Sequence, residues 1–227
     1  MSPPTEPPPV RDTAETVRKH VETAVVEDEV LQSARARAGE LGVSAVSPSV
    51  GAALGFLARV LGARTVVEVG TGGGISGTWL LRGMRPDGVL TTIDSEPEHQ
   101  RAARVTFSEA GFASGRVRII NGRALDVLPR LTDGGYDLVL VDPGPHGRTD
   151  HPRYLHDAAR LLRPGGVVVL HGVLVGADVT DPARRDPATV ALRETARTVT
   201  EDERWTPLLL PLGDGVLAAV LAEPGTY

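Results

Sequence analysis

The residues with the clearest chemical meaning lie together at 66–76, where a β-branched apolar run ends in Glu68 and glycines follow at 70, 72, 73 and 74. Glycine permits positive φ and leaves no Cβ between the backbone N–H groups and a ligand. A helical pattern begins around Leu80, so the segment has the order strand, glycine turn, helix that builds a nucleotide pocket in an open α/β sheet. The Glu68 carboxylate is unfavourable beside a pyrophosphate and suits a ligand that carries a positive group.

The spacing of the glycines leaves the type of pocket open. Gly72, Gly74 and Gly77 fit G-x-G-x-x-G, which is typical of dinucleotide binding, whereas Gly70, Gly72 and Gly74 fit G-x-G-x-G. A glycine-rich turn without any ligand is the third interpretation. Three features further along the chain favour a ligand.

Acidic and polar residues end the strands expected beside this loop. Asp94 closes the strand 89–93, where a carboxylate can accept both hydroxyls of a ribose; its alternative role is to cap the helix that follows Ser95. The segment 121–124 follows the third strand, where an adenine edge would lie. Asp142 ends the central strand 136–141 and therefore faces whatever lies across from the ligand.

Four of the six histidines fall between 146 and 171. Together with Asp142 they could bind a transition metal, but no tight ligand spacing supports such a site. His146 and His151 lie in a polar Pro/Gly loop and His156 lies on a helix, so we expect these three to face solvent. His171 ends a central strand, where an imidazole can serve as a general base; the alternative is a hydrogen-bonded structural residue.

The elements that must position these residues alternate in type along the chain. We expect a helix over 12–38 and a second helix from Ser47 to Gly62, with Pro48 in its first turn. Apolar runs then predict strands at 65–69, 89–93, 116–120, 136–141 and 167–171, with helices at 75–84, 97–110, 123–131 and 152–163.

The chain closes differently from a dehydrogenase domain, which has six parallel strands. A loop at 172–187 precedes a polar helix that reaches about Glu203. Apolar runs at 205–211 and 216–222 flank Gly213-Asp214-Gly215, which predicts an antiparallel hairpin.

Composition limits the class of protein. A chain of 227 residues with 41% apolar content suits one sizeable α/β domain, which we expect over 12–227 after a disordered proline-rich tail at 1–11. The net charge of −5 and the lack of a dense basic patch argue against a nucleic-acid partner. No cysteine, membrane-length apolar run or signal-peptide pattern is present, so we expect a cytoplasmic protein without a membrane partner.

Taken together, these motifs resemble a known family. Glu68-Val-Gly-Thr-Gly-Gly-Gly, Asp94, Asp137, Asp142 and Leu162-Arg-Pro-Gly-Gly look like the ordered motifs of class I S-adenosylmethionine-dependent methyltransferases. The segment 43–48 and Ser76 narrow the resemblance to small-molecule O-methyltransferases related to the catechol and caffeoyl-CoA enzymes, in particular their actinobacterial relatives. It covers roughly 12–222. It implies a Rossmann-like α/β fold, with a seven-stranded mixed sheet whose last strand is antiparallel and helices on both faces, and a homodimer.

The resemblance also implies roles for single residues. Glu68 and the Gly70-Thr71-Gly72 backbone would hold the methionine part of S-adenosylmethionine, with Val43 and Ser76 beside it. Asp94 would bind the ribose, Ala124 would lie by the adenine, and Asp142 would face both substrate and cofactor. The sulfonium and ammonium groups of this cofactor explain the carboxylates, because opposite charge lowers the cost of burial.

The sequence departs from the metal-dependent members of the family. These coordinate Mg²⁺ with an Asp after the fourth strand and an Asp-Asn pair after the fifth, where this chain has Asp142 but then His171-Gly172. The family's catalytic lysine position holds Pro145. Imidazole is a poorer ligand for Mg²⁺ than a carboxylate. We therefore expect methyl transfer to a hydroxyl of a small phenolic-type acceptor without obligatory Mg²⁺ or any other metal site, with Asp142 and His171 as the catalytic residues.

Two other functions remain open at this point. A cofactor-binding protein that has lost catalysis would keep Glu68 and Asp94 and would explain the missing lysine. An NAD-binding oxidoreductase would use the same glycine loop, although the chain's single lysine, Lys19, excludes a Tyr-x-x-x-Lys pair. No G-x-S-x-G and no Walker lysine are present, so a hydrolase or a P-loop enzyme is unsupported.

Overall fold

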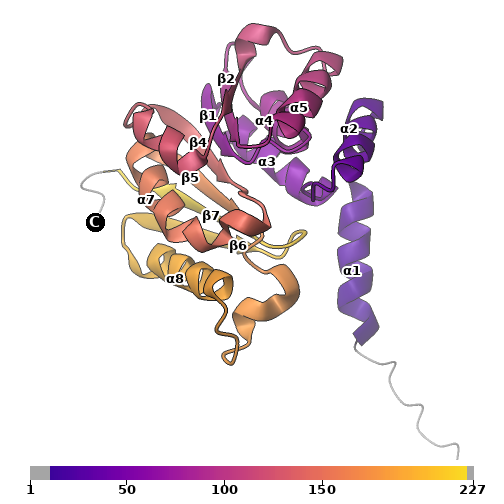
Figure 1. Ribbon diagram of the computed structural model, residues 1–227. Helices are drawn as coiled ribbons and strands as arrows, with labels where there is room; N and C mark the ends of the chain where they lie inside the picture. The colour runs from indigo at the N-terminus through magenta and orange to yellow at the C-terminus, as the bar shows by residue number, and fades with distance from the viewer. Residues whose placement is uncertain (1–10, 224–227) are drawn as a thin grey trace, which may run out of the picture.

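Residues 11–223 are described by a computed structural model of the chain (Figure 1). Within this range seven strands form one sheet in the order β3-β2-β1-β4-β5-β7-β6. In chain order the strands are β1 (Thr65–Val69), β2 (Val89–Asp94), β3 (Val117–Asn121), β4 (Tyr136–Val141), β5 (Leu162–His171), β6 (Trp205–Leu210) and β7 (Val216–Leu221). The strands from β3 to β5 pair in parallel, whereas β7 is antiparallel to both β5 and β6. The predicted mixed sheet and closing hairpin are therefore confirmed.

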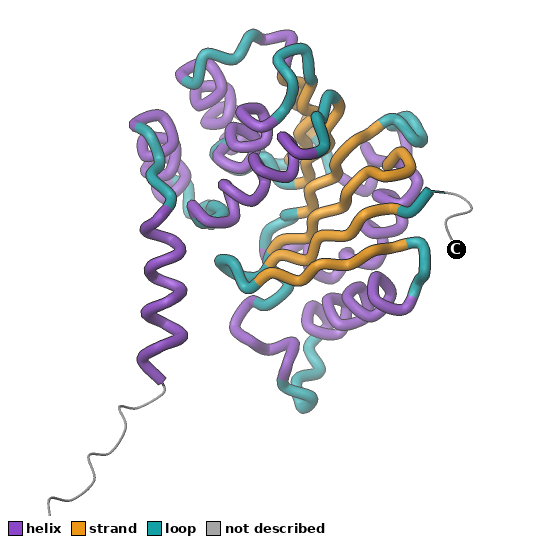
Figure 2. The backbone as a smooth tube through the Cα atoms, turned by 180° about the vertical axis from the view of Figure 1, so that it is seen from behind, coloured by secondary structure: helices purple, strands orange, loops and turns teal. Residues whose placement is uncertain are grey.

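Helices cover both faces of this sheet, as Figure 2 shows. They are α1 (Arg11–Ala24), α2 (Glu29–Glu40), α3 (Pro48–Val60), α4 (Ile75–Gly83), α5 (Pro97–Glu109), α6 (Ala124–Val127), α7 (His151–Leu161) and α8 (Pro187–Glu201). Helices α2 to α5 pack on one face, and α6 to α8 pack on the other. No helix among residues 11–223 has the length and apolar character needed to span a bilayer.

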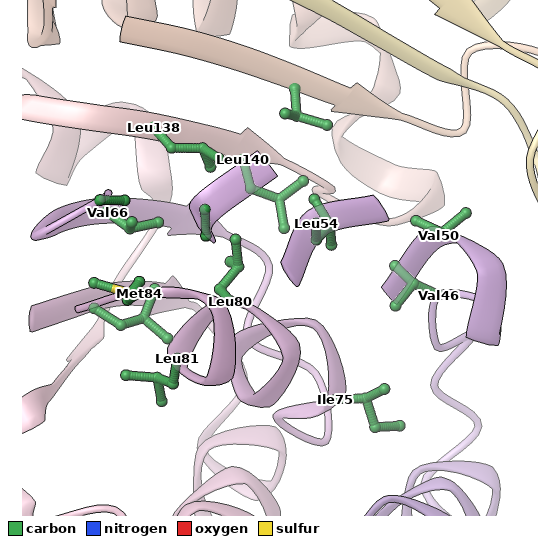
Figure 3. Packing of buried hydrophobic residues seen from close by; sticks show 14 of the residues in the cluster. Val46, Val50, Leu54, Val66, Ile75, Leu80, Leu81, Met84, Leu138 and Leu140 are labelled. Carbon is green, nitrogen blue, oxygen red and sulfur yellow. The ribbon is translucent and has the colours of Figure 1, made fainter. Parts of the chain in front are cut away.

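The strand sequences divide their side chains between these two layers. Successive residues of a strand point to opposite faces, so Val66 and Leu138 join the core with α3 and α4 (Figure 3), while Val67 and Val139 join the core with α7 and α8. Strands buried on both faces explain the continuous apolar runs from which they were predicted.

Asp137 connects the amino-terminal ends of three central strands. Its Oδ2 accepts hydrogen bonds from the backbone N–H groups of Arg64 and Thr65 at 2.7 and 2.9 Å, and its Oδ1 accepts one from Nε of Arg163 at 2.7 Å. These bonds hold the pKa of Asp137 below its usual range despite burial, which alone raises it. The motif residue Asp137 is thus part of the scaffold at the end of the sheet away from the glycine loop.

The single helix predicted over 12–38 was wrong. The chain leaves helical conformation after Ala24, and Asp28 adopts φ −73° and ψ 175° as the N-cap of a separate helix, α2. Its side chain accepts a hydrogen bond from the N–H of Leu31 at 3.1 Å. The capping carboxylate outweighs the helical spacing of the apolar residues around it.

Helix α1 extends away from the sheet in Figures 1 and 2 and is tied to α3 through Glu22. The Glu22 carboxylate accepts hydrogen bonds from N and Oγ of Ser49 at 3.0 and 2.6 Å. Ser47 is the N-cap of α3 and Pro48 lies in its first turn, as predicted. Residues 1–10 of the predicted tail lie outside the described residues, and its last residue, Arg11, begins α1.

Three further segments differ from those predicted. Helix α7 ends at Leu161 and β5 begins at Leu162, five residues before the predicted start at 167, with a register shift against β4 between Tyr136 and Leu138. The helix predicted at 123–131 is only the single turn α6 followed by a 3₁₀ turn at 128–130. The loop predicted at 172–187 contains a 3₁₀ helix at Val175–Thr180.

Candidate active site

The glycine loop joins β1 to α4 at the carboxyl end of the sheet. Gly70, Gly72 and Gly74 have φ of 92°, 48° and 81°. A Cβ on Gly70 would lie 1.9 Å from the carbonyl oxygen of Asp142, so a side chain there would push the loop off the end of β4. Gly77 lies inside α4, where a Cβ would meet Phe107 at 2.9 Å. The pattern G-x-G-x-G therefore describes the turn, and Gly77 serves helix packing.

A cavity of about 740 Å³ opens beside this loop, across the carboxyl ends of β1, β2, β4 and β5. Its position follows from the topology, because the strand order reverses between β1 and β4. The residues predicted from the sequence that line it are Val43, Gly70, Thr71, Gly72, Ser76, Asp94, Ala124, Asp142 and His171. Residues from β1, β2, the turn after β3, β4 and β5 thus meet in one pocket.

Glu68 is the exception among the predicted residues, because it lies behind the cavity wall. Its side chain is fully buried and accepts hydrogen bonds from the hydroxyls of Ser76 and Thr92, each at 2.6 Å. The Thr92 hydroxyl donates its hydrogen bond to Glu68. In the 2.8 Å contact between the Thr71 and Thr92 hydroxyls, Thr71 is therefore the donor. Glu68 therefore holds two cavity residues, Thr71 and Ser76, through short hydrogen-bonded connections.

Burial also sets the protonation of Glu68. It raises the pKa from 4.5 to about 7, the Asp142 and Asp94 carboxylates act in the same direction, and the Ser76 and Thr92 hydroxyls only partly offset them. A positive group bound in the cavity would favour the ionised form.

The Asp94 carboxylate is held by backbone N–H groups from two segments, while the N-cap position of α5 is taken by Glu96. Oδ2 of Asp94 accepts hydrogen bonds from the backbone N–H groups of Thr71 and Gly72, both at 3.0 Å. Its Oδ1 accepts one from the N–H of Glu96 at 2.9 Å, at the start of α5. The carboxylate thus fixes the glycine loop against β2 and still lines the cavity. Sequence reasoning missed His99, whose Nδ1 lies 3.3 Å from Oδ2 of Asp94.

Asp142 and His171 come together across the ends of β4 and β5. Nδ1 of His171 lies 3.1 Å from Oδ1 of Asp142, although the approach is not aligned as a regular hydrogen bond. Burial lowers the pKa of His171, but the adjacent Asp142 carboxylate outweighs it, so the pKa is raised above its ordinary value. A buried imidazole next to a carboxylate, open to a cavity, can accept a proton from a ligand.

The side chains at this end do not fit Mg²⁺ in the manner of the metal-dependent methyltransferases. Asp142 supplies one carboxylate, but that group is occupied with His171, and Gly172 supplies no side chain. Among the side chains that the structure describes, no three His, Asp or Glu residues group at metal-ligand spacing. Mg²⁺ requires several oxygen ligands in octahedral geometry, and this donor set lacks them.

The prediction that His151 faces solvent was wrong. Its side chain is fully buried, lines the cavity and lies edge-on to Tyr154. The signal was present in the sequence: Pro152 marks a helix start, and Tyr154, Leu155 and Ala158 place His151 on the apolar face of α7. His146 and His156 are exposed, as expected.

Comparisons with known proteins agree with this geometry. Residues 21–221 match the family described as O-methyltransferase. A curated relative from Mycolicibacterium smegmatis, provisionally named an O-methyltransferase, is 54% identical over 92% of this chain and 98% of its own length.

Two solved structures extend the similarity to three dimensions. A protein from Corynebacterium glutamicum has a TM-score of 0.86 at 32% identity, covering 95% of this chain and 100% of that chain. The O-methyltransferase TomG from Streptomyces achromogenes, involved in tomaymycin synthesis and solved in complex with S-adenosylmethionine, has a TM-score of 0.81 at 34% identity, covering 92% and 96%. The chain therefore belongs to the O-methyltransferase family of class I S-adenosylmethionine-dependent enzymes.

Proposed function

We propose that this enzyme methylates a hydroxyl of a small phenolic-type acceptor and that it does so without obligatory Mg²⁺. The observation that carries the proposal is a single cavity that joins the glycine loop to the Asp142–His171 pair. Family membership identifies the cofactor as S-adenosylmethionine rather than NAD and makes a catalytically inactive protein the weaker alternative.

We infer that Val43, Ser76 and the loop backbone at Gly70–Gly72 hold the methionine part of S-adenosylmethionine. We propose further that Asp94 binds the ribose and that Ala124 contacts the adenine. What supports these roles is that all of these residues line one cavity. Glu68 contributes indirectly, because its hydrogen bonds orient Ser76 and, through Thr92, Thr71.

The chemical demands on the protein are modest. When bound, S-adenosylmethionine supplies a methyl group on a positively charged sulfur, which leaves as a neutral thioether. The cavity walls hold the acceptor oxygen in line, and such positioning can supply roughly 7–11 kcal/mol of the barrier. His171 takes the hydroxyl proton onto its imidazole, and Asp142 stabilises the imidazolium that results. Proton removal of this kind contributes about 10²–10⁴-fold to the rate.

The direct test is a methylation screen over phenols, hydroxy acids and amines, with labelled S-adenosylmethionine and with or without EDTA. We expect transfer to a hydroxyl that EDTA does not abolish. Activity that is lost with EDTA and restored by Mg²⁺ would refute metal independence. Cofactor binding without transfer to any acceptor would favour the binding-only alternative.

We also propose that the enzyme is a homodimer. Phe56 and Val60 lie one turn apart on α3 and are each 67% exposed, which is unusual for two large apolar side chains on one helix face. A small-molecule acceptor remains the proposed partner, and the cytoplasmic location stays a prediction.

A further inference from the structure

The acceptor end of the cavity contains two polar side chains that the chemistry above does not use. They are Arg148, on the 3₁₀ helix Pro145–Asp150, and His151, the first residue of α7. Both line the same cavity as Asp142 and His171. Their hydrogen-bonding needs define what a ligand there must offer.

His151 needs a hydrogen-bond donor. Its Nδ1 lies 2.8 Å from the carbonyl oxygen of Arg148. A carbonyl oxygen only accepts, so Nδ1 carries the proton and Nε2 presents a lone pair. Nε2 is buried and has no partner among the described residues. Burial lowers the pKa of His151, which keeps the imidazole neutral near pH 7, and the unmet requirement is therefore for an O–H or N–H group.

Arg148 needs an acceptor. Its guanidinium has five N–H donors, and it forms no hydrogen bond or ion pair with any side chain or backbone group that the structure describes. One terminal nitrogen lies 4.0 Å from the point where a Cβ on Gly172 would be. Gly172 is the second position of the pair that binds Mg²⁺ in the metal-dependent relatives. The permanent positive charge of Arg148 therefore lies beside the place where those enzymes have a metal ligand.

The acids around Arg148 do not remove its need for an anion. Asp142 is engaged with His171 at 3.1 Å, and Asp150 lies 3.7 Å from Arg153. Asp214 also lines the cavity, from the turn between β6 and β7. A guanidinium without a carboxylate partner in a pocket wall is well suited to bind a carboxylate or phenolate in two-point geometry.

We propose that the acceptor is an acidic phenol: a small molecule with a carboxylate bound by Arg148, a second hydroxyl that donates to Nε2 of His151, and the hydroxyl that is methylated. This inference rests on the proposed function and narrows its substrate class. Arg148 and His151 act as specificity residues, and the proton of the reacting hydroxyl still goes to His171.

The test compares matched acceptors that lack one group at a time. The acids are 2,3-, 2,5- and 3,4-dihydroxybenzoate; the amides of these acids remove the charge, and 2- and 3-hydroxybenzoate remove the second hydroxyl. We expect kcat/KM for at least one acid to exceed that for its amide by about 10–100-fold, the range for a charge-assisted hydrogen bond.

Variants assign the effect to residues. Arg148→Gln should bring the acid-to-amide ratio close to one. Arg197→Gln, which changes an exposed arginine on α8 outside the cavity, should leave the ratio unchanged. His151→Gln should lower kcat/KM for the dihydroxy acid roughly 5–10-fold more than for the monohydroxy acids, the range for a neutral hydrogen bond. Because each result is a ratio between two substrates of one variant, partial loss of folded protein does not change it.

The outcomes separate this inference from the proposed function. Amides methylated as well as the acids, or an unchanged ratio in Arg148→Gln, overturn the acidic-acceptor inference. Methylation of neutral phenols alone overturns it too, and leaves the proposed function intact. Methylation of no phenol, charged or neutral, with S-adenosylmethionine bound, overturns the proposed function itself.

Discussion

At the scale of single residues, Glu68 is a carboxyl side chain that is fully buried beside the cavity. It lies between Ser76 and Thr92, and its pKa is raised from 4.5 to about 7 chiefly by burial. The folded protein therefore holds a proton that the unfolded chain releases between these two values. A group with this behaviour destabilises the fold as the pH rises.

The first prediction concerns this proton. Without cofactor, the free energy of unfolding should fall by up to roughly 3 kcal/mol between about pH 4.5 and pH 7.5, since each pKa unit corresponds to about 1.4 kcal/mol. Urea unfolding of the wild type and of Glu68→Gln across this range measures the effect. The neutral glutamine should remove most of the slope; an equal slope in both proteins would show that another group is responsible.

The second prediction concerns His171. Because the base must be neutral, kcat should increase with pH through the raised pKa of His171 and then level off. Asp142→Asn removes the charge that raises this pKa and leaves burial, which lowers it, so the rising limb should move to lower pH while the rate decreases. His171→Ala should reduce kcat about 10²–10⁴-fold.

The pH–rate profile of the two variants and NMR titration of the His171 ring measure these changes. If the rising limb of the pH–rate profile lies at the same pH in Asp142→Asn as in the wild type, His171 is not the group that causes the pH dependence.

At the scale of elements, the sequence predicts the strands well because buried parallel strands are continuous apolar runs with glycine or acidic ends. Secondary structure is predicted less well where one polar residue competes with an apolar pattern. The spacing of Leu31 and its neighbours predicted one continuous helix, but Asp28 caps a separate helix there. His151 was assigned to a loop because its local composition is polar, although its contacts come from packing of α7 on the sheet.

The same limit applies to the active site. Gly70 and Asp142 could be placed from motifs because strand ends are fixed by topology. Glu68 lies behind the cavity and acts through the hydroxyls of Ser76 and Thr92. These two residues are far apart in the sequence and meet only in the folded protein, so the motif could not predict this role.

The third prediction tests an element junction. Asp137→Asn should lower the free energy of unfolding by about 1–3 kcal/mol, because it removes the charge that two backbone N–H groups and Arg163 share. Since the pKa of Asp137 is lowered in the fold, its stabilisation is present above its unfolded pKa and is lost as the pH falls through the folded value. Denaturant titrations at pH 7 and pH 3 measure both effects. A variant as stable as the wild type at pH 7 would contradict the assigned role.

At the scale of the whole molecule, the fourth prediction concerns assembly. If α3 forms the dimer interface, Phe56→Glu with Val60→Glu should convert the dimer to a monomer in light scattering. A matched change at Leu208 and Leu209, which are 52% and 55% exposed on β6, should not. If the wild type is a monomer at working concentration, the dimer proposal is wrong. If only the change on β6 dissociates the dimer, the interface lies at the edge of the sheet and not on α3.

The position of β7 has a consequence for how the fold is completed. In chain order β7 follows the other six strands of the sheet, yet it lies between β5 and β6, and the turn before it supplies Asp214 to the cavity. Backbone bonds from Gly172 to Gly215 (2.9 Å) and from Leu174 to Asp214 (2.8 Å) fix the segment that follows His171. The glycine loop and the first five strands all precede these residues in the chain, so the acceptor wall needs a later segment than the nucleotide pocket does. Removal of the hairpin β6–β7 would therefore leave the glycine loop in the chain but take away part of the wall that a substrate contacts.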